Sequence, residues 1–533
     1  MTPSVASALK ERTESAQETQ EETTVMTARR PGRRAVMVSA VLTQLMIVLD
    51  LTIIAIALPR MQDDLGMTVS QSPWTVTGYS LAFGGLVLFG GRLCAVVGIR
   101  RSYQVGLIGF GVASLAAGMA TSFPILLVAR VAQGCFGALL APTSQSLLNV
   151  TFTERTERER VFAIFGATGG LGAAVGLLVG GALTDWISWR WALYINILLA
   201  TAALLIGQRS LPPADQRDRS SRITDDLTGL VLGCGACFSA VYGLDRAQQT
   251  SWTSTSTVSW LALGGIAAVL FVVRERFANR PVLPLSMMAL PVRAASYATQ
   301  FIAGAGQMGA IIYLTYYMQN HFGYSPFKSG VVFLPMVLAL IATAIPAGRV
   351  IVPRLGARGT LPLGLAVLTG SFLIFSRMTT QSSYSQVALP GLIVFGIGLG
   401  LTMPVTFNSG TRGVDAKRTG LASAILSAAQ QIGGSFGVAL MTSYATQHAE
   451  DYVAEHSEEV RAAAMEAMMR AQALPQSPAG KQIIEALKAQ LVDRAQIEAY
   501  AGGFTMMAWI LAGAGAALVA CGIALSVRRR RTR

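Results

Sequence analysis

Hydrophobic stretches separated by short polar connections run through most of the chain. Each of fourteen stretches is long enough to cross a bilayer, since a spanning helix needs about 20 apolar residues. The predicted spans are 35–58, 73–92, 103–121, 124–149, 161–184, 189–208, 227–245, 256–273, 295–318, 329–350, 360–377, 386–408, 419–445 and 503–527. The pattern therefore predicts an all-α integral membrane protein with fourteen transmembrane helices.

Two longer polar connections, at 209–226 and 274–294, divide these spans into six, two and six. We expect an N-terminal six-helix bundle, an inserted two-helix hairpin and a C-terminal six-helix bundle. Their predicted bounds are 35–208, 227–273 and 295–527.

Between the last two spans lies a polar segment, 446–501, which we expect to be an extracellular loop. It is periodic enough for helices at Val453 to Ala473 and Lys481 to Tyr500. A surface cap is its expected role, and a lid or partner site is the alternative.

A short repeat indicates that the two bundles are related. Gly98-Ile99-Arg100 follows the second span, and Gly356-Ala357-Arg358 follows the tenth span, which is the second of the C-terminal six. Transporters with repeated halves bind their substrate between the halves near the bilayer midplane.

Composition excludes a soluble globule, because 52% of the residues are hydrophobic and only 13% are charged. The net charge of +14 could suggest nucleic-acid binding, but the basic residues precede the first span and recur in alternate loops up to Arg528–Arg531. This distribution follows the positive-inside rule and places both termini in the cytoplasm of a cell-membrane protein. We expect residues 1–34 to be a disordered cytoplasmic tail and 528–533 to be a basic cytoplasmic tail, without a nucleic-acid partner.

Cysteine and histidine usage indicates neither a disulfide framework nor a metal centre. The five cysteines lie in or beside spans, and the three histidines are scattered. No metal, cofactor or enzymatic residue is predicted, and we expect a self-sufficient monomer.

Only two charges, Asp50 and Arg130, fall well inside the predicted spans. A charge in hydrocarbon is costly, by roughly 3 kcal/mol on insertion scales, so it persists mainly where it has a partner and a function. Counted at 1.5 Å per residue, Asp50 lies about 22 Å above the inner end of its span and Arg130 about 9 Å below the outer end of its span. In a core about 30 Å thick these depths coincide, so a pair is geometrically possible.

Several motifs resemble those of the fourteen-helix drug:proton antiporters of the major facilitator superfamily. The first span contains LDLTIIAIALP, which resembles the LDxTxxNxALP signature of that family. Eight further matches follow in the family's order: WTVTGY at 74–79, GRLCAVVGIRR at 91–101, ARVAQG at 129–134, a glycine-rich run at 166–183, WRWALYIN at 189–196, GYSPFKSG at 323–330, Pro335, and TGLASAILSAAQQIGGSFG at 419–437.

Four positions depart from the family pattern. Ala55 replaces the Asn of the first motif, and Ala95 replaces the Asp of the loop between helices two and three. Leu177 and Leu198 each replace a Pro. In the family the inner-loop Asp helps to latch the two halves in one state, so Ala95 predicts an altered gate.

The resemblance implies a proton-coupled exporter of drugs or other small amphipathic molecules that works by alternating access. Burial disfavours a charged carboxylate whereas a nearby guanidinium favours it, so Asp50 can gain and lose a proton as its surroundings change. We predict Asp50 and Arg130 as the proton-coupling pair. A purely structural ion pair is the alternative.

Polar and aromatic residues of the spans are the candidates for substrate binding, and glycines and inner-loop arginines are the candidates for gating. The predicted substrate residues are Tyr79, Gln133, Gln307, Tyr313, Tyr316, Asn408, Gln430 and Gln431. The predicted gating residues are Gly91, Gly98, Arg100, Arg101, Gly176, Gly180 and Gly181. For each substrate candidate, ordinary packing between helices is an equally good interpretation.

An ATP-driven pump is disfavoured, because the chain has no Gly-x4-Gly-Lys-Ser/Thr loop and no soluble domain large enough to bind and hydrolyse nucleotide. A facilitator or symporter on the same fold and a non-transporting membrane scaffold or sensor are the remaining alternatives.

Overall fold

The computed structural model describes most of the chain between residues 32 and 531. The described ranges are 32–68, 71, 74–208, 210–211, 226–278, 281, 283, 287–288, 290–414, 419–470 and 478–531. Most of the predicted tail at 1–34 and the last two residues of the basic tail lie outside them. Every regular element within these ranges is a helix, which confirms the all-α prediction.

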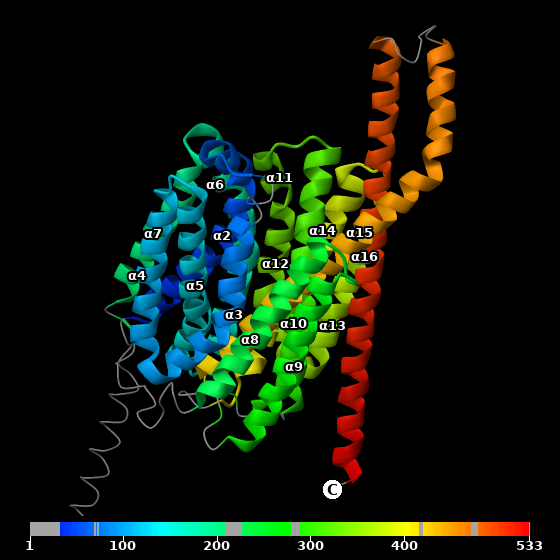
Figure 1. Ribbon diagram of the computed structural model, residues 1–533. Helices are drawn as coiled ribbons and strands as arrows, with labels where there is room; N and C mark the ends of the chain where they lie inside the picture. The colour runs from blue at the N-terminus through cyan, green and yellow to red at the C-terminus, as the bar shows by residue number, and fades with distance from the viewer. Residues whose placement is uncertain are drawn as a thin grey trace, which may run out of the picture.

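Within the described ranges, six helices form the N-terminal bundle, drawn in blue and cyan on the left of Figure 1. They are α2 (Arg33–Leu65), α3 (Trp74–Val97), α4 (Ile99–Gly118), α5 (Phe123–Thr151), α6 (Arg155–Trp186) and α7 (Trp189–Gly207). α2 packs against α5, α6 and α7, and α5 packs against both α3 and α4. We call the lower face in Figure 1, where α16 ends, the basal face.

Local sequence signals set several helix ends. α2 ends at Gly66, whose φ of 59° is a left-handed conformation that glycine adopts without strain. Ser188 begins α7 and accepts a hydrogen bond from the backbone N–H of Arg190. Asp226 and Ser254 begin the next two helices in the same way.

The inserted hairpin consists of α8 (Leu227–Gln249) and α9 (Thr255–Phe277). α8 packs against both α3 and α15, so it touches both bundles, while α9 packs mainly on α8. The outer side of α9 exposes apolar residues such as Ile266 and Val269, as expected for a surface covered by lipid.

The C-terminal bundle occupies the right of Figure 1. Its helices are α10 (Pro291–Tyr316), α11 (Pro326–Val332), α12 (Leu334–Pro346), α13 (Val352–Phe375), α14 (Leu389–Thr411), α15 (Thr419–Arg470) and α16 (Pro478–Arg531). π-helical turns lie at Tyr317–His321, Ala347–Ile351 and Tyr384–Ala388.

α15 and α16 extend beyond the bundle and project as a helical pair on the side opposite the basal face (Figure 1). The segment predicted as an extracellular loop at 446–501 is therefore mostly a continuation of these two helices. The predicted helices at 453–473 and 481–500 fall within it, apart from residues 471–473, which lie outside the described ranges.

The repeated tripeptides adopt similar backbone conformations. Gly98, between α3 and α4, has φ 97° and ψ 150°, and Gly356, at a kink in α13, has φ 64° and ψ 174°. Glycine is favoured at both positions because side chains rarely allow a positive φ. The two halves thus share a local turn as well as a sequence.

Ten segments of the described chain are long and apolar enough to cross a membrane. One of them, Phe327–Phe375, contains both α12 and α13, and α4, α6 and α10 are not among the ten. The membrane character of the chain is clear from these segments, and the count of fourteen spans stays a prediction.

Candidate functional site

Asp50 and Arg130 form an ion pair inside the N-terminal bundle. Arg130 Nη1 lies 2.6 Å from Asp50 Oδ2, and neither side chain has any exposed surface. Asp50 comes from the middle of α2 and Arg130 from α5. The contact that the estimated depths of Asp50 and Arg130 made possible is therefore present in the structure.

Two amides satisfy the second carboxylate oxygen of Asp50. Asn196 Nδ2 of α7 donates to Asp50 Oδ1 over 2.6 Å, and Gln133 Nε2 of α5 donates to it over 3.2 Å. A buried charge is tolerated only when it is paired and hydrogen-bonded in this way. Asn196 was not among the predicted site residues, although it ends the WRWALYIN motif in an otherwise apolar span.

Arg130 is held by three further neighbours. Its Nε donates to the backbone carbonyl of Thr75 over 3.1 Å, and its Nη1 donates to Gln133 Oε1 over 2.9 Å. Its guanidinium carbon lies 4.6 Å from the centre of the Tyr79 ring, a cation–π contact. Gln133 also donates to Ser114 Oγ of α4, so the cluster includes side chains or backbone from five helices, α2, α3, α4, α5 and α7.

Close helix packing positions this cluster. A Cβ at Gly134, next to Gln133, would collide with the backbone carbonyl of Tyr79, so α3 and α5 are in backbone contact there. A Cβ at Gly176 of α6 would likewise collide with Thr52 of α2, two residues after Asp50. Small residues allow membrane helices to approach this closely, and they fix the depth of the charged side chains.

Three polar atoms in the cluster have no hydrogen-bond partner among the described residues. They are Tyr79 Oη, Arg130 Nη2 and Asn196 Oδ1, and all three are buried. Buried polar atoms usually have a partner, so these three atoms can each take a further hydrogen bond.

The charge balance of the cluster defines what it can do. With Asp50 ionised, the pair is neutral overall. A proton on Asp50 would leave the Arg130 cation without its carboxylate in a site that excludes water, which is strongly unfavourable. Protonation of Asp50 would therefore favour a movement of Arg130 or an opening of the site.

The structure brings Tyr79 and Gln133 into this cluster but keeps the predicted substrate residues of the second half apart from it. Tyr313 Oη donates to Thr442 Oγ1 over 3.0 Å between α10 and α15, and Tyr316 is half exposed. Gln307, Gln430 and Gln431 are half-buried on α10 and α15.

Asn408 contacts the first half at the basal face. Asn408 Oδ1 of α14 accepts a hydrogen bond from Arg158 Nε of α6 over 3.0 Å. Substrate contact by any of the eight predicted residues stays a prediction.

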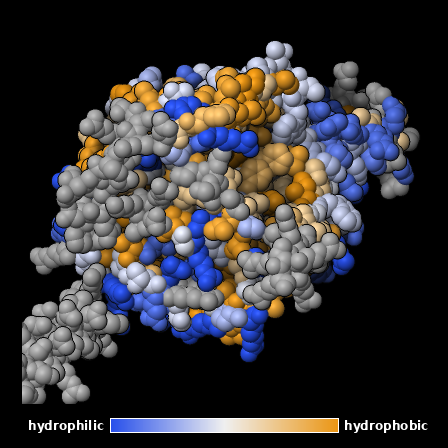
Figure 2. Space-filling view, turned by 90° about the horizontal axis from the view of Figure 1, so that it is seen from below, coloured by the Kyte–Doolittle hydropathy of each residue, from blue (hydrophilic) through white to orange (hydrophobic). Residues whose placement is uncertain are grey.

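The two bundles are joined at the basal face. Besides the Arg158–Asn408 bond, Thr411 Oγ1 of α14 donates to Asn149 Oδ1 of α5 over 3.3 Å, and Gln145 Nε2 of α5 donates to Ser427 Oγ of α15 over 3.2 Å. Seen from below, hydrophilic residues are spread over this face between hydrophobic ones (Figure 2). These contacts join the two halves on the basal side.

One predicted gating residue, Gly91, lies at this junction. A Cβ at Gly91 of α3 would lie 2.5 Å from Ala424 Cβ of α15, so the two halves meet there without space for a side chain. Gly176 and Gly180 instead pack against α2, within the first half, and Gly181 is buried on the same helix.

The other predicted gating residues lie at the turn between α3 and α4. Gly98 supplies the positive φ of this turn, and Arg101 is exposed. Arg100 Nη2 donates to the backbone carbonyl of Gln208 over 3.4 Å, a contact within the first half.

Two apolar hollows flank α5 on its outer side. One, of about 500 Å³, lies between α4 and α5, and the other, of about 480 Å³, lies between α3, α5 and α8. Neither is lined by a predicted substrate residue.

These features define a class of protein. Two helical bundles with a shared turn, packed against each other, with a buried ion pair inside one of them, fit the architecture of a secondary transporter with repeated halves. The sequence profile described as the Major Facilitator Superfamily matches residues 40–438. The chain belongs to this superfamily.

Several transport and resistance proteins are similar to this chain over most of their length. The puromycin resistance protein pur8 of Streptomyces alboniger is 40% identical over 78% of this chain and 82% of its own. The tetracenomycin C resistance and export protein of Streptomyces glaucescens is 32% identical over 74% of this chain and 73% of its own. The crystal structure of the human organic anion transporter MFSD10 shares the fold, with a TM-score of 0.54 at 13% identity, and covers 90% of this chain and all of its own.

Proposed function

We propose that this chain exports small amphipathic drugs or antibiotics across the cell membrane in exchange for protons. Puromycin and tetracenomycin C, which appear in the names of its relatives, indicate the class of substrate. The observation that supports proton exchange is the fully buried pair of Asp50 and Arg130. The site needs no cofactor, because a proton gradient supplies the energy.

The proposed cycle alternates between two states. With the basal side closed, a proton reaches Asp50 from the opposite side and neutralises it, and Arg130 is released from the carboxylate. The unused capacity of Arg130 Nη2 and Tyr79 Oη can then stabilise the rearranged cluster. Opening of the basal side releases the proton, Asp50 regains its charge, and substrate binds for the return step.

The orientation follows from the distribution of basic residues. We place the basal face, with both termini, in the cytoplasm, because the arginines of alternate loops and of Arg528–Arg531 belong on that side. The helical pair formed by α15 and α16 then projects outside the cell. A monomer suffices for this cycle, since one chain contains both halves.

Transport by purified protein in vesicles tests the proposal. A fluorescent cationic dye should accumulate in inside-out vesicles only when their lumen is acidified, and a protonophore should abolish accumulation. Asp50→Asn should abolish gradient-driven transport. Asp64→Asn, which removes a carboxylate that pairs with Arg190 at an exposed position, is the matched control and should transport normally.

Counterflow separates exchange from other modes of transport. If Asp50→Asn still couples dye movement to the pH gradient, the assignment of Asp50 is wrong. If the wild-type protein moves dye without a gradient and at the same rate in both directions, it is a facilitator and not an exporter.

A further inference from the structure

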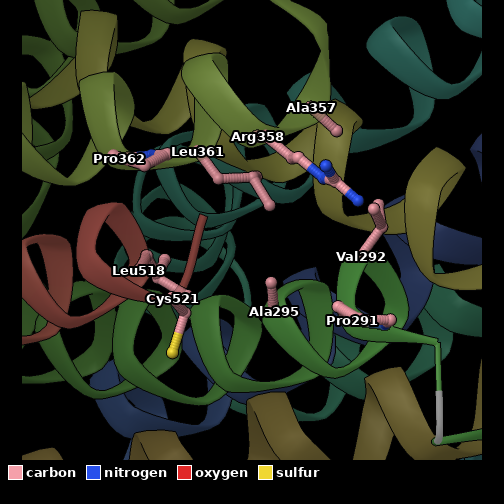
Figure 3. A pocket seen from close by; sticks show the side chains of 9 residues that line it. All are labelled: Pro291, Val292, Ala295, Ala357, Arg358, Leu361, Pro362, Leu518 and Cys521. Carbon is pink, nitrogen blue, oxygen red and sulfur yellow. The ribbon is translucent and has the colours of Figure 1, made fainter. Parts of the chain in front are cut away.

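A narrow crevice opens between α10, α13 and α16 near the basal face. Its volume is about 50 Å³, and its lining is apolar except for one arginine, Arg358. Figure 3 shows Arg358 and Leu361 reaching from α13 toward α10, with Leu518 and Cys521 of α16 on the other side.

The corresponding place in the first half is occupied by different side chains. The repeat aligns Gly98 with Gly356, so Arg100 corresponds to Arg358 and Tyr103 corresponds to Leu361. Tyr103 is fully buried among α2, α4 and α7, where its hydroxyl lies 2.8 Å from Ser39 Oγ and 2.6 Å from Thr43 Oγ1. Leu361 is also buried, packs with Ala295 and Leu518 and lines the crevice, but a leucine has no hydroxyl to form such hydrogen bonds.

The two corresponding arginines also differ. Arg100 donates to the carbonyl of Gln208. Arg358 is exposed, and no described carboxylate or carbonyl accepts a hydrogen bond from it. The second half therefore presents a guanidinium without an anion directly above an apolar crevice.

We propose that this crevice binds an anionic phospholipid, with its phosphate on Arg358 and part of one acyl chain against the apolar side chains that line the crevice. A guanidinium matches the geometry of phosphate, and basic pockets between membrane helices on the cytoplasmic side bind anionic headgroups. The crevice takes a short stretch of the chain. The rest lies along the exposed apolar side chains of Leu355 and Val519.

The assignment to the cytoplasmic leaflet rests on the orientation given under the proposed function, whereas lipid binding itself does not. That leaflet carries a negative surface charge, which attracts basic segments such as Arg528–Arg531 at the end of α16. Charge and hydrophobic surface thus favour the same ligand at the same depth.

Native mass spectrometry of the purified full-length chain tests the proposal without any transport assay. Dioleoyl phosphatidylglycerol should bind more tightly than dioleoyl phosphatidylcholine. Arg358→Ala should lower phosphatidylglycerol binding about fivefold, the ratio that corresponds to about 1 kcal/mol per basic residue near an anionic surface. Arg354→Ala, an exposed arginine on the same helix that does not line the crevice, is the matched control and should leave binding unchanged.

A second variant tests the apolar part of the site. Leu361→Tyr copies the first half and should reduce binding of both lipids, because the ring fills the crevice. In vesicles, phosphatidylglycerol should slow alkylation of Cys521 in the wild-type chain but not in Arg358→Ala.

The proposal is overturned by any of three results. The first is an equal loss of phosphatidylglycerol binding in Arg358→Ala and Arg354→Ala. The second is competition by soluble glycerol phosphate that is as strong as competition by the lipid. The third is unchanged lipid binding in a folded Leu361→Tyr variant. A chain that binds the lipid but exports no dye would contradict the proposed function and leave this site standing.

Discussion

Removal of one partner of the Asp50–Arg130 pair should destabilise the fold far more than removal of both. Neither side chain is exposed, so a single substitution leaves a charge buried without its counter-charge. Such a loss costs about 3–5 kcal/mol, whereas replacement of a whole buried pair by neutral residues is often neutral or stabilising. In Asp50→Asn, Arg130 keeps the Thr75 carbonyl, Gln133 Oε1 and the Tyr79 ring, so we expect a loss near the lower limit, about 3 kcal/mol.

The two single variants should respond differently to pH. An arginine keeps its charge in proteins, so Asp50→Asn leaves a cation that has no means of neutralisation. Arg130→Met instead leaves a carboxylate, which can take up a proton. The destabilisation by Arg130→Met should therefore shrink as the pH falls, and that by Asp50→Asn should stay constant.

Reversible unfolding in mixed micelles, with increasing dodecyl sulfate, measures these free energies at two pH values. The double variant Asp50→Asn/Arg130→Met should lie within about 1 kcal/mol of the wild type, which gives a large interaction term in the double-mutant cycle. Gradient-driven transport should be lost in all three variants. If the two single effects simply add in the double variant, the pair does not act as a coupled buried ion pair, and the reasoning fails.

Three further predictions concern the contacts between and within the halves. Gly91→Ala should push α3 away from α15 and increase the labelling of cysteines introduced at the basal face. Gly265→Ala is the control, because a Cβ there meets no atom within 4 Å, and it should not change the labelling. Equal labelling in the two variants would contradict the predicted gate. Asn408→Asp should turn the contact with Arg158 into an ion pair, favour the closed basal side and slow transport severalfold, and a faster cycle in transport assays would argue against this role. Hydrogen bonds from Arg190 and Trp189 hold the pKa of Asp64 below its usual range. The contact should therefore stabilise the junction of α2 and α7 above the usual carboxyl pKa and lose that effect as the pH falls through the lowered pKa. The difference in free energy of unfolding between wild type and Asp64→Asn should vanish in acid, and a difference that stays constant with pH would refute this prediction.

The sequence allowed the ion pair to be predicted because charges in spans are rare. Asp50 and Arg130 were selected by that rarity alone, and helical rise placed them at one depth. Asn196 was missed although Gln133 and Asn408 were selected, because residue type alone does not tell which amide of a span faces a buried charge. The backbone carbonyl of Thr75 was missed because a backbone acceptor leaves no trace in the sequence.

Hydropathy predicted the helices that lie within the membrane, but it did not predict where polar helices continue beyond it. Hydropathy separated spans from connections, but it does not distinguish a polar loop from a helix that continues into water. α15 and α16 therefore extend well into the segment predicted as a loop. The substrate residues of the second half were chosen by chemical type, and type does not tell whether Tyr313 bonds a neighbouring helix or a ligand.

Small residues pack at the basal face at the position where the family resemblance places an inner-loop acid. Where that acid would stand, Ala95 is half-buried at the end of α3, and its neighbours Gly91 and Cys94 pack directly on Gly420 and Ala424 of α15. Close packing of small residues thus joins the helices at a point where the family has a charge.

Three hydrogen bonds among the described residues also join the halves on the basal side. Two join neutral groups and one, Arg158 to Asn408, involves a charge. Net contributions of about 1 kcal/mol for each neutral bond and about 2 kcal/mol for the charged one make a total of a few kcal/mol. A ligand or proton whose affinity for the two states differs by that amount would offset these bonds, whereas complete reversal of a 99:1 population takes about 5.5 kcal/mol. Closure by packing and weak polar contacts is therefore compatible with alternation between two states.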